Sequence, residues 1–219
     1  RDRVVAERRI SALTDNLKRG YETELRVGCT PTLSLHALPQ PVADFARDNP
    51  SIRLDMRQAH SALLAKMLHD GHVDLVIGPP EIAARVPGTE AVPLFSSPVV
   101  ILASRFHPLA GRKTITNQDL NDARWILHQP GTGIREATDI LLRRLGVNET
   151  LQASELPSNM ILALLRLGDQ LAALPRYVLR NMDIASELVQ IAGEEPPVLL
   201  GHDAITMASQ TSKTTGKFI

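Results

Sequence analysis

Asp74-Leu75-Val76-Ile77-Gly78 contains an uninterrupted apolar run of strand length after its first residue. Such a run is typical of a strand that is covered on both faces, as in parallel sheets. Working outward, residues 24–29 and 52–56 alternate apolar and polar side chains and predict two more strands. Helical periodicity fills the gaps, from about Leu33 to Asp48 and from Ser61, a candidate N-cap, to Gly71. This order predicts an α/β fold, in which helices cover both faces of a parallel sheet.

A second unit of similar plan is expected after Pro79-Pro80, which breaks the first. It should begin with two strands, 92–95 and 99–103, separated by Ser96-Ser97-Pro98. The remaining elements that the patterns predict are the strands 124–127, 151–155, 171–174, 188–191 and 204–208, and the helices 117–121, 134–145 and 159–167. The last strand could return the chain to the first unit.

The composition excludes several classes of protein. The chain has 219 residues, and its 24 Lys and Arg balance 24 Asp and Glu, so these residues carry no overall basic footprint for nucleic acid. Aromatic residues make up 3% and are scattered, which argues against base stacking. The single Cys29 allows no intramolecular disulfide and no multi-cysteine zinc site. No apolar run is long enough for a membrane helix. A cytosolic protein without a membrane partner is expected.

The first residues form a pattern of their own. Ala6, Ile10, Leu13 and Leu17 recur at steps of three and four, which predicts a coiled-coil-like helix that Gly20 ends. Residues 1–19 carry six basic against three acidic side chains. We expect residues 1–20 to be the C-terminal part of a linker helix whose upstream partner is missing. An ordinary amphipathic first helix is the alternative.

Several pieces of sequence together resemble a known family. In order along residues 20–180, they are Leu25-Arg26-Val27-Gly28, Ala37-Leu38-Pro39, Phe45 with Asn49-Pro50, Leu68 through Gly71 to Ile77, His107-Pro108-Leu109-Ala110 and Leu171-Ala172-Ala173-Leu174-Pro175. Each piece is common by itself. Their order and spacing resemble the effector-binding domain of LysR-type transcriptional regulators.

The resemblance implies two Rossmann-like lobes joined by two crossover strands, a type 2 periplasmic-binding-protein-like fold. Lobe I would comprise residues 22–97 and about 205–219, and lobe II about 98–204. The crossings would lie near Ser97–Leu102 and Ile205–Ser209. It also implies a small-molecule effector in the cleft, a homo-oligomer, no cofactor and no catalysed reaction. DNA would be bound only through a winged helix-turn-helix that precedes this chain.

The resemblance also implies a subunit contact. The helix Leu33 to Asp48 and the strand Ile52 to Met56 would pack antiparallel against the helix Asn159 to Leu167 of a partner subunit. Effector binding would then shift the arrangement of a dimer or tetramer.

Loops that follow the predicted strands are candidates for a ligand site, independently of the family. In open parallel sheets, ligands bind beyond the carboxyl ends of the strands. Those loops supply hydroxyls or helix starts at Thr30, Thr32, Ser61, Thr132 and Ser158. Helix N-termini carry unsatisfied N–H donors and partial positive charge, so the pattern predicts a small anionic effector. For each hydroxyl taken singly, plain helix capping is the favoured explanation, and capping is compatible with ligand binding.

By matching positions, the resemblance places effector contacts at Thr30, Thr32, His60, Pro79 and Thr132. Gly131 and Gly133 flank Thr132, and Cys29 lies at the mouth of the same pocket. Pro79 departs from the family, because some relatives have a polar or cationic residue there and proline offers neither charge nor a donor. A specific dicarboxylate is therefore disfavoured.

Rival interpretations can be weighed from the same residues. Redox or nucleophilic chemistry at Cys29 would lack a second cysteine to resolve a sulfenic acid. His69 and His72 lack a third ligand nearby for a metal, and Gly131-Thr132-Gly133 lacks the Lys-Ser/Thr of a nucleotide loop. An enzyme using Cys29 or His60 would lack a recognisable base. A two-lobed solute-binding protein for a small anion is the main alternative, and residues upstream of Arg1 would distinguish it from a regulator.

Overall fold

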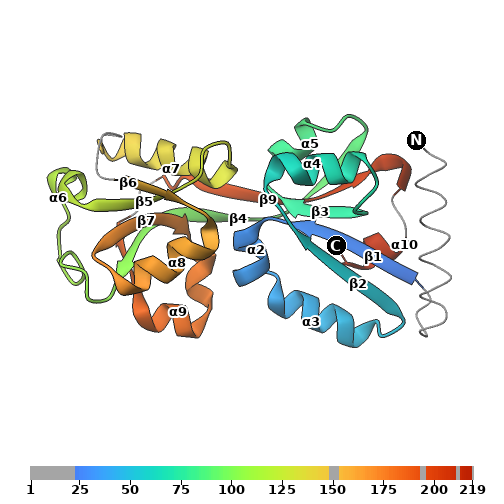
Figure 1. Ribbon diagram of the computed structural model, residues 1–219, viewed down its shortest axis with the longest axis horizontal. Helices are drawn as coiled ribbons and strands as arrows, with labels where there is room; N and C mark the ends of the chain where they lie inside the picture. Colours follow the sequence, from blue (N-terminus) through green and yellow to red (C-terminus); the bar gives the residue numbers. More distant parts are fainter. Residues whose placement is uncertain (1–22, 148–152, 193–195, 211–212, 219) are drawn as a thin grey trace. The chain divides into compact units, whose positions relative to one another are not determined.

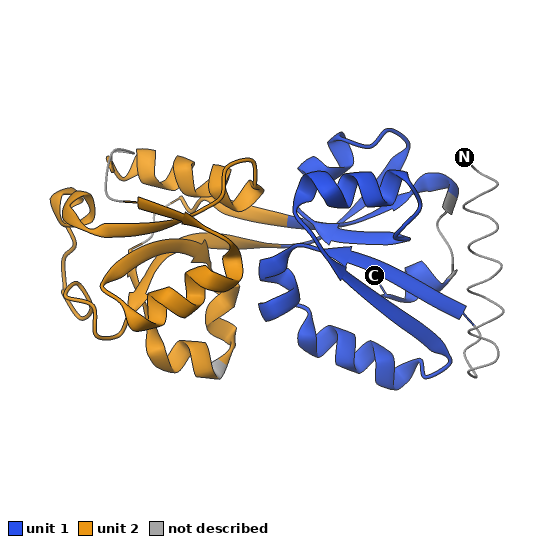
Figure 2. Cartoon of the chain, in the orientation of Figure 1, with its two compact units in different colours: residues 1–95, 202–219 blue, residues 96–201 orange. Residues whose placement is uncertain are grey.

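The chain forms two compact units. The computed structural model describes residues 23–147, 153–192, 196–210 and 213–218. Unit 1 comprises Arg1–Phe95 and His202–Ile219, and unit 2 comprises Ser96–Gly201 (Figure 2). The helix expected over residues 1–20 lies outside the described residues.

Unit 1 is built on a parallel sheet with one antiparallel strand. Its strands are β1 (Thr23–Cys29), β2 (Ile52–Gln58), β3 (Leu75–Gly78) and most of β9 (Leu199–Met207), in the order β2-β1-β3-β9. β1 runs parallel to β2 and β3, and β9 runs antiparallel to β3. The helices and the 3₁₀ turn of this unit are α2 (Pro31–His36), α3 (Pro39–Asp48), α4 (Ser61–His69), α5 (Glu81–Ala84), η2 (Ala208–Gln210) and α10 (Lys213–Phe218). Figure 1 shows α4 and α5 on one face of this sheet and α2 and α3 on the other.

The helix α4 packs closely against β1 on one face of the unit 1 sheet. A Cβ atom added to Gly28 would lie 2.8 Å from Leu64 Cδ2 and 3.4 Å from Val76 Cγ2. Leu64 and Val76 are fully buried and belong to the same apolar cluster as Ile82 and Ile205. The missing side chain of Gly28 therefore lets α4 pack tightly over the sheet, as glycine allows where elements approach closely.

Unit 2 has a mixed sheet of its own. Its strands are the second half of β4 (Thr89–Ser104), together with β5 (Arg124–His128), β6 (Ala153–Leu156), β7 (Gln170–Pro175) and β8 (Leu188–Ala192). The order is β4-β7-β5-β6, with β8 on β4; β5 is parallel to β6 and β7, and β4 is antiparallel to β7. The helices are α6 (Asn117–Asp122), α7 (Gly133–Arg144), α8 (Ser158–Leu167), η1 (Arg176–Arg180) and α9 (Met182–Glu187). Trp125 is buried in the core between these elements.

Two strands, β4 and β9, pass from one unit into the other. In unit 1, Ala208 N–H donates to Gly88 O (3.0 Å), and in unit 2, Val99 N–H donates to Val198 O (2.8 Å). Within each unit, the two crossing segments are therefore joined to each other by a backbone hydrogen bond.

Two expectations about the elements were wrong. The helix expected from about Leu33 to Asp48 is two helices, α2 and α3, with a break at Ala37 and Leu38. Pro39 causes the break, because it has no N–H to donate to the preceding turn. The strands expected at 92–95 and 99–103 are a single strand, β4. Pro98 does not interrupt it, since the fixed φ of proline is compatible with extended backbone.

Candidate functional site

The carboxyl ends of three parallel strands meet at one edge of the unit 1 sheet. In the β1–β2 and β1–β3 registers, Cys29 lies opposite Gln58 and Ile77. Ala59 N–H donates to Cys29 O at 3.2 Å, which fixes the loop after β2 beside the end of β1. Thr30 and Pro79 directly follow β1 and β3, and His60 lies two residues after the end of β2. The structure therefore brings these three expected contact residues to the same edge.

Their side chains differ in accessibility. Thr30 is the N-cap residue of α2 but its half-buried side chain makes no capping hydrogen bond. Thr32, in the first turn of α2, is only 7% exposed. His60 is exposed and occupies the N-cap position of α4. The hydroxyl of Thr30 is thus not used for capping, whereas Thr32 is buried within its unit.

Ser61 is not the N-cap that the pattern predicts. The backbone of His60 is extended, with φ −75° and ψ 159°, so His60 is the N-cap and the helix begins at Ser61, one residue earlier than expected. Ser61 is buried, and no side chain makes a capping hydrogen bond at this helix start. The first N–H groups of α4 therefore remain donors without a side-chain cap.

Cys29 and Pro79 are buried at this edge. Burial raises the pKa of the Cys29 thiol to about 11, so the thiol stays protonated at neutral pH. The thiolate is the nucleophilic and oxidisable form, so burial disfavours redox or nucleophilic chemistry here. Both residues contribute shape to the edge rather than charge or donors.

Unit 2 has a corresponding edge. β5 and β6 are parallel, and His128 at the end of β5 lies opposite Leu156 at the end of β6. The loop Gly131 to Gly133 follows β5, and Ser158 follows β6. Gly131 has φ +76°, in the left-handed region that glycine adopts most readily. The loop can therefore turn sharply into α7.

Thr132 caps α7, as its position predicts. Its Oγ1 accepts a hydrogen bond from Arg135 N–H (3.3 Å) and donates one to Gln129 O (2.9 Å). The hydroxyl proton is therefore committed to the loop. An anion at this helix start would be held by the N–H groups of the first turn, such as those of Gly133 and Ile134, while Thr132 keeps the turn in shape.

Ser158 does not cap α8. The N-cap position is Pro157, and Ser158 is the first helical residue, 8% exposed. The extended backbone of Pro157 (ψ 150°) places the helix boundary one residue before the serine. The expected capping role of Ser158 is therefore wrong.

Arg135 is a functional candidate that the sequence pattern missed. Its guanidinium donates to His128 O (2.9 Å), to Asp139 Oδ1 (2.8 Å) and to Glu155 Oε1 (2.7 Å). Burial lowers the pKa of Arg135, but the hydrogen bonds and charges of Glu155 and Asp139 outweigh it, so the pKa is raised. This cation fixes the start of α7 to the ends of β5 and β6. Arg135 and Asp139 are four residues apart, and this spacing in the sequence could have predicted their ion pair on a helix.

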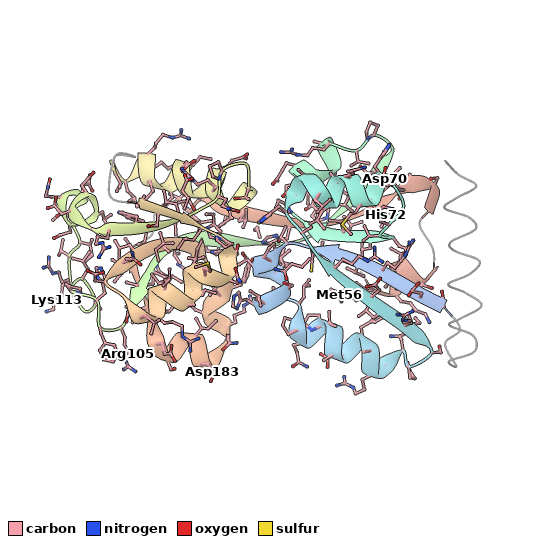
Figure 3. The ribbon with its side chains drawn as sticks, in the orientation of Figure 1. Met56, Asp70, His72, Arg105, Lys113 and Asp183 are labelled. Atoms are coloured by element: carbon pink, nitrogen blue, oxygen red, sulfur yellow. The ribbon has the colours of Figure 1, made fainter. Side chains whose placement is uncertain are left out.

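The turn after α4 does not form a metal site. Figure 3 shows His72 and Asp70 at the surface where α4 ends. Within the described ranges, no group of three or more His, Cys, Asp or Glu side chains is placed to hold a metal ion. The Asp70 carboxylate forms an ion pair with Lys66 one turn earlier.

Comparison with known proteins gives consistent matches. A family model described as the LysR substrate binding domain matches residues 18–219. The HTH-type transcriptional regulator GalR of Pseudomonas putida is 28% identical over 173 residues, 76% of this chain and 42% of that protein. The HTH-type transcriptional regulator CysL of Bacillus subtilis is 27% identical over 165 residues, 75% of this chain and 54% of that protein. The chain thus spans about half the length of these curated relatives.

Solved structures share the fold. The CcmR regulatory domain of Synechocystis PCC6803, in complex with 2-PG, superposes with a TM-score of 0.74 and 26% identity, over 90% of this chain and 93% of that one. The two-lobed, type 2 periplasmic-binding-protein-like fold of such domains is the fold expected from the sequence. In the described part of the chain, no helix is long and apolar enough to span a membrane.

Proposed function

This chain belongs to the LysR substrate binding domain family, and we propose that it senses a small anionic effector and converts binding into a changed oligomer arrangement. Members of this family are named as transcriptional regulators, and not as enzymes. The chain is accordingly the effector-binding domain of a LysR-type regulator. What it binds, and how binding is transmitted, are the proposal.

The proposal of an anionic effector rests on the helix starts at the two sheet edges. In unit 1, the first turn of α4 has no side-chain cap and the Thr30 hydroxyl makes no capping bond. In unit 2, Thr132 and Gly131 hold the first turn of α7 in shape. N–H groups and partial positive charge at helix starts favour carboxylate, sulfate or phosphate.

The proposed contacts are Thr30, Thr32, His60, Pro79, Cys29, Gly131, Thr132, Gly133 and Ser158, in the interlobe cleft that the family resemblance implies. Their roles differ. Thr30 and His60 would contact the effector by side chain, and Gly131 and Gly133 by backbone. The buried Cys29, Thr32, Pro79 and Ser158 would shape the surface. The relative CcmR holds 2-PG, which makes 2-PG the first compound to test.

The oligomer is proposed to form through α8 and the α3–β2 face of a second copy. On α8, Met160, Leu164 and Leu167 are 45%, 36% and 85% exposed, at helical steps of four and three. An apolar stripe of this kind on a helix is suited to packing against another apolar surface. The half-buried Ile52 and Leu54 of the edge strand β2 offer such a surface in unit 1.

Control of transcription is proposed to operate through population shift. An effector that binds one arrangement of the subunits better than another biases the equilibrium by that difference in affinity. DNA contact would be made by a domain outside this chain, since curated relatives are about twice as long as their matching regions.

A thermal-shift screen tests the anionic effector. Wild-type protein is heated with 2-PG, phosphate, sulfate, acetate and succinate, with ionic strength held constant by sodium chloride, and glycerol serves as the uncharged control. We expect at least one anion to raise the unfolding temperature saturably, because a ligand that binds only folded protein stabilises it. If none exceeds the sodium chloride control, the proposal fails.

A further inference from the structure

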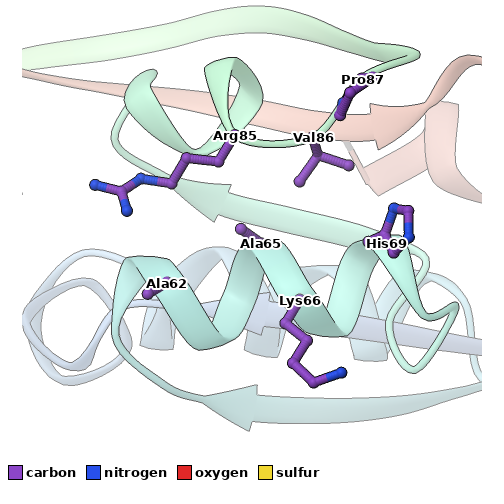
Figure 4. A pocket seen from close by; sticks show the side chains of 7 residues that line it. All are labelled: Ala62, Ala65, Lys66, His69, Arg85, Val86 and Pro87. Atoms are coloured by element: carbon purple, nitrogen blue, oxygen red, sulfur yellow. The ribbon is translucent and has the colours of Figure 1, made fainter.

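A groove in unit 1 lies apart from the candidate effector site. It runs between one face of α4 and the segment after α5 and is lined by Ala62, Ala65, Lys66, His69, Arg85, Val86 and Pro87 (Figure 4). Its volume is about 430 Å³. The four helical positions follow steps of three, one and three, so they form one continuous face of α4.

The walls of the groove are held in place. Val86 is 2% and Ala65 6% exposed, and both belong to the apolar cluster under α4. Thr89 Oγ1 donates to Val86 O (3.0 Å) and to Ala83 O (3.3 Å), which ties the segment after α5 into a turn. The groove therefore exists before any ligand arrives, which reduces the entropic cost of binding.

The chemistry of the lining is apolar with a cationic rim. The exposed Ala62 and Pro87 supply most of the apolar surface, with the buried Ala65 and Val86 beneath them, and none of the lining residues is acidic. The Lys66 ammonium forms an ion pair with Asp70 and points away from the segment after α5 (Figure 4). Arg85 extends over the Ala62 end of the groove (Figure 4). Among the described residues, no hydrogen bond or ion pair engages the Arg85 guanidinium.

The size of the groove favours a small molecule over a protein partner. Ligand pockets typically measure about 300 to 1,000 Å³ and combine apolar walls with a few polar groups. Stable protein interfaces need about 800 Å² from each partner, which seven residues cannot supply. The lining has basic but no acidic side chains, which favours an anionic ligand. A guanidinium such as that of Arg85 is suited to binding a carboxylate.

We propose that this groove binds a small organic carboxylate whose apolar body covers Ala62 and Pro87, above the buried Ala65, and whose carboxylate contacts Arg85. The site does not depend on the effector site. It uses the flank of α4, whereas the effector contact at His60 precedes the first residue of that helix.

Methyl NMR of the whole 219-residue chain tests this directly. The protein is labelled at alanine methyl groups and titrated with hexanoate, 1-hexanol and acetate. Hexanoate carries both the apolar body and the charge, 1-hexanol only the body, and acetate only the charge. We expect hexanoate to shift the Ala65 and Ala62 methyl signals saturably, and each partial ligand to bind about tenfold more weakly or less.

Two variants assign the contacts. Arg85→Gln should weaken hexanoate binding about tenfold, because it removes the charge-assisted hydrogen bond. Ala62→Leu, at an exposed helical position where leucine is tolerated, should fill the groove and abolish the Ala65 shift. The matched control is Arg143→Gln, which replaces an exposed arginine on α7, away from the groove, and should bind as wild type.

The proposal is overturned if the Ala65 methyl signal does not saturate with hexanoate, if acetate or hexanol matches hexanoate, or if Arg85→Gln binds as tightly as Arg143→Gln. Loss of the effector response in the thermal-shift screen leaves all three outcomes unaffected, so the two sites are tested separately.

Discussion

Arg26 and Asp74 form a bidentate ion pair across unit 1. Arg26 Nη2 lies 2.6 Å from Asp74 Oδ1, Arg26 Nε donates to Asp74 Oδ2 at 3.0 Å, and the Arg26 backbone N–H donates to the same oxygen. Arg26 Nη1 also donates to Gly71 O at 2.8 Å. One side chain therefore connects β1 to the turn between α4 and β3, the turn that sets the direction of the buried strand.

Replacement of Asp74 by asparagine should destabilise the chain. Asp74→Asn leaves the Arg26 guanidinium mostly buried without its carboxylate. We expect the free energy of unfolding to fall by about 2 kcal/mol, less than the roughly 3 to 5 kcal/mol for a fully buried pair, because both side chains are partly exposed. Urea denaturation measures this. Asp44→Asn, which removes an exposed ion pair with Arg47 on α3, should leave the urea midpoint nearly unchanged. Equal effects of the two substitutions would contradict this account of the turn.

A methyl group at Gly28 should disturb the contact between α4 and β1. Gly28→Ala places a Cβ atom 2.8 Å from the buried Leu64 Cδ2, so Leu64 must move in a packed core. Overpacking of this kind costs about 1 to 3 kcal/mol, measurable as a lower denaturation midpoint. Gly216→Ala, in α10, is the control, because nothing lies within 4 Å of its added methyl group. Equal midpoints for Gly28→Ala and wild type would show that α4 packs more loosely.

His202 should make stability depend on pH. Its ring contacts the ring of Phe95, with centroids 4.8 Å apart and the two planes tilted by 46°, and His202 is 1% exposed. Burial lowers the pKa of His202 from 6.5 to about 4, so between these values the unfolded chain binds a proton that the folded chain does not. The free energy of unfolding is therefore highest above pH 6.5 and falls as the pH drops towards 4, by about 2 kcal/mol between pH 7 and pH 5.

Denaturation at pH 5 and pH 7 checks the role of His202. His202→Gln lacks the titrating group, so its unfolding free energy should change less with pH than that of wild type. His72→Gln, at an exposed position, should keep the wild-type dependence. A wild-type slope in His202→Gln would mean that other groups govern the acid sensitivity.

The exposed stripe on α8 should control self-association. Leu164→Glu places a charge in the proposed subunit contact and should weaken association at least about tenfold, because an unpaired charge would be buried there. Ile140→Glu is the matched control, since Ile140 on α7 is 38% exposed against 36% for Leu164. Sedimentation over a concentration series measures both. Equal association of the two variants would remove α8 from the interface.

The sequence predicts the elements of this fold better than it predicts their partners. The continuous apolar run at β3 and the apolar–polar alternation at β1 and β2 correctly predict a parallel sheet. Burial on both faces of a strand requires a continuous apolar run, and burial on one face requires alternation. The effect of the prolines was predicted wrongly. Pro39 splits a predicted helix, whereas Pro98 lies inside an unbroken strand, and local pattern does not distinguish the two cases.

The candidate site was predictable only where the chemistry is local. The Thr132 cap follows from residues within one turn, and the structure confirms it. Ser61 and Ser158 looked equally suitable, but each helix begins one residue earlier than a serine cap requires. Arg135 was missed because its contact with Glu155 depends on how β6 pairs with β5. Contacts set by strand register leave no periodic signal in the sequence.

Anion-dependent stabilisation of three threonine variants tests the central claim most directly. Thr132→Val and Thr116→Val each remove a helix N-cap in unit 2, at α7 and α6, and each should cost about 1 kcal/mol of stability. Thr30→Val removes a hydroxyl that makes no capping bond and should cost little. Each variant is heated with the same panel of anions as wild type. We predict that Thr116→Val keeps the anion-induced rise in unfolding temperature, whereas Thr30→Val and Thr132→Val lose most of it. A wild-type rise in Thr30→Val and Thr132→Val would contradict the proposed effector site.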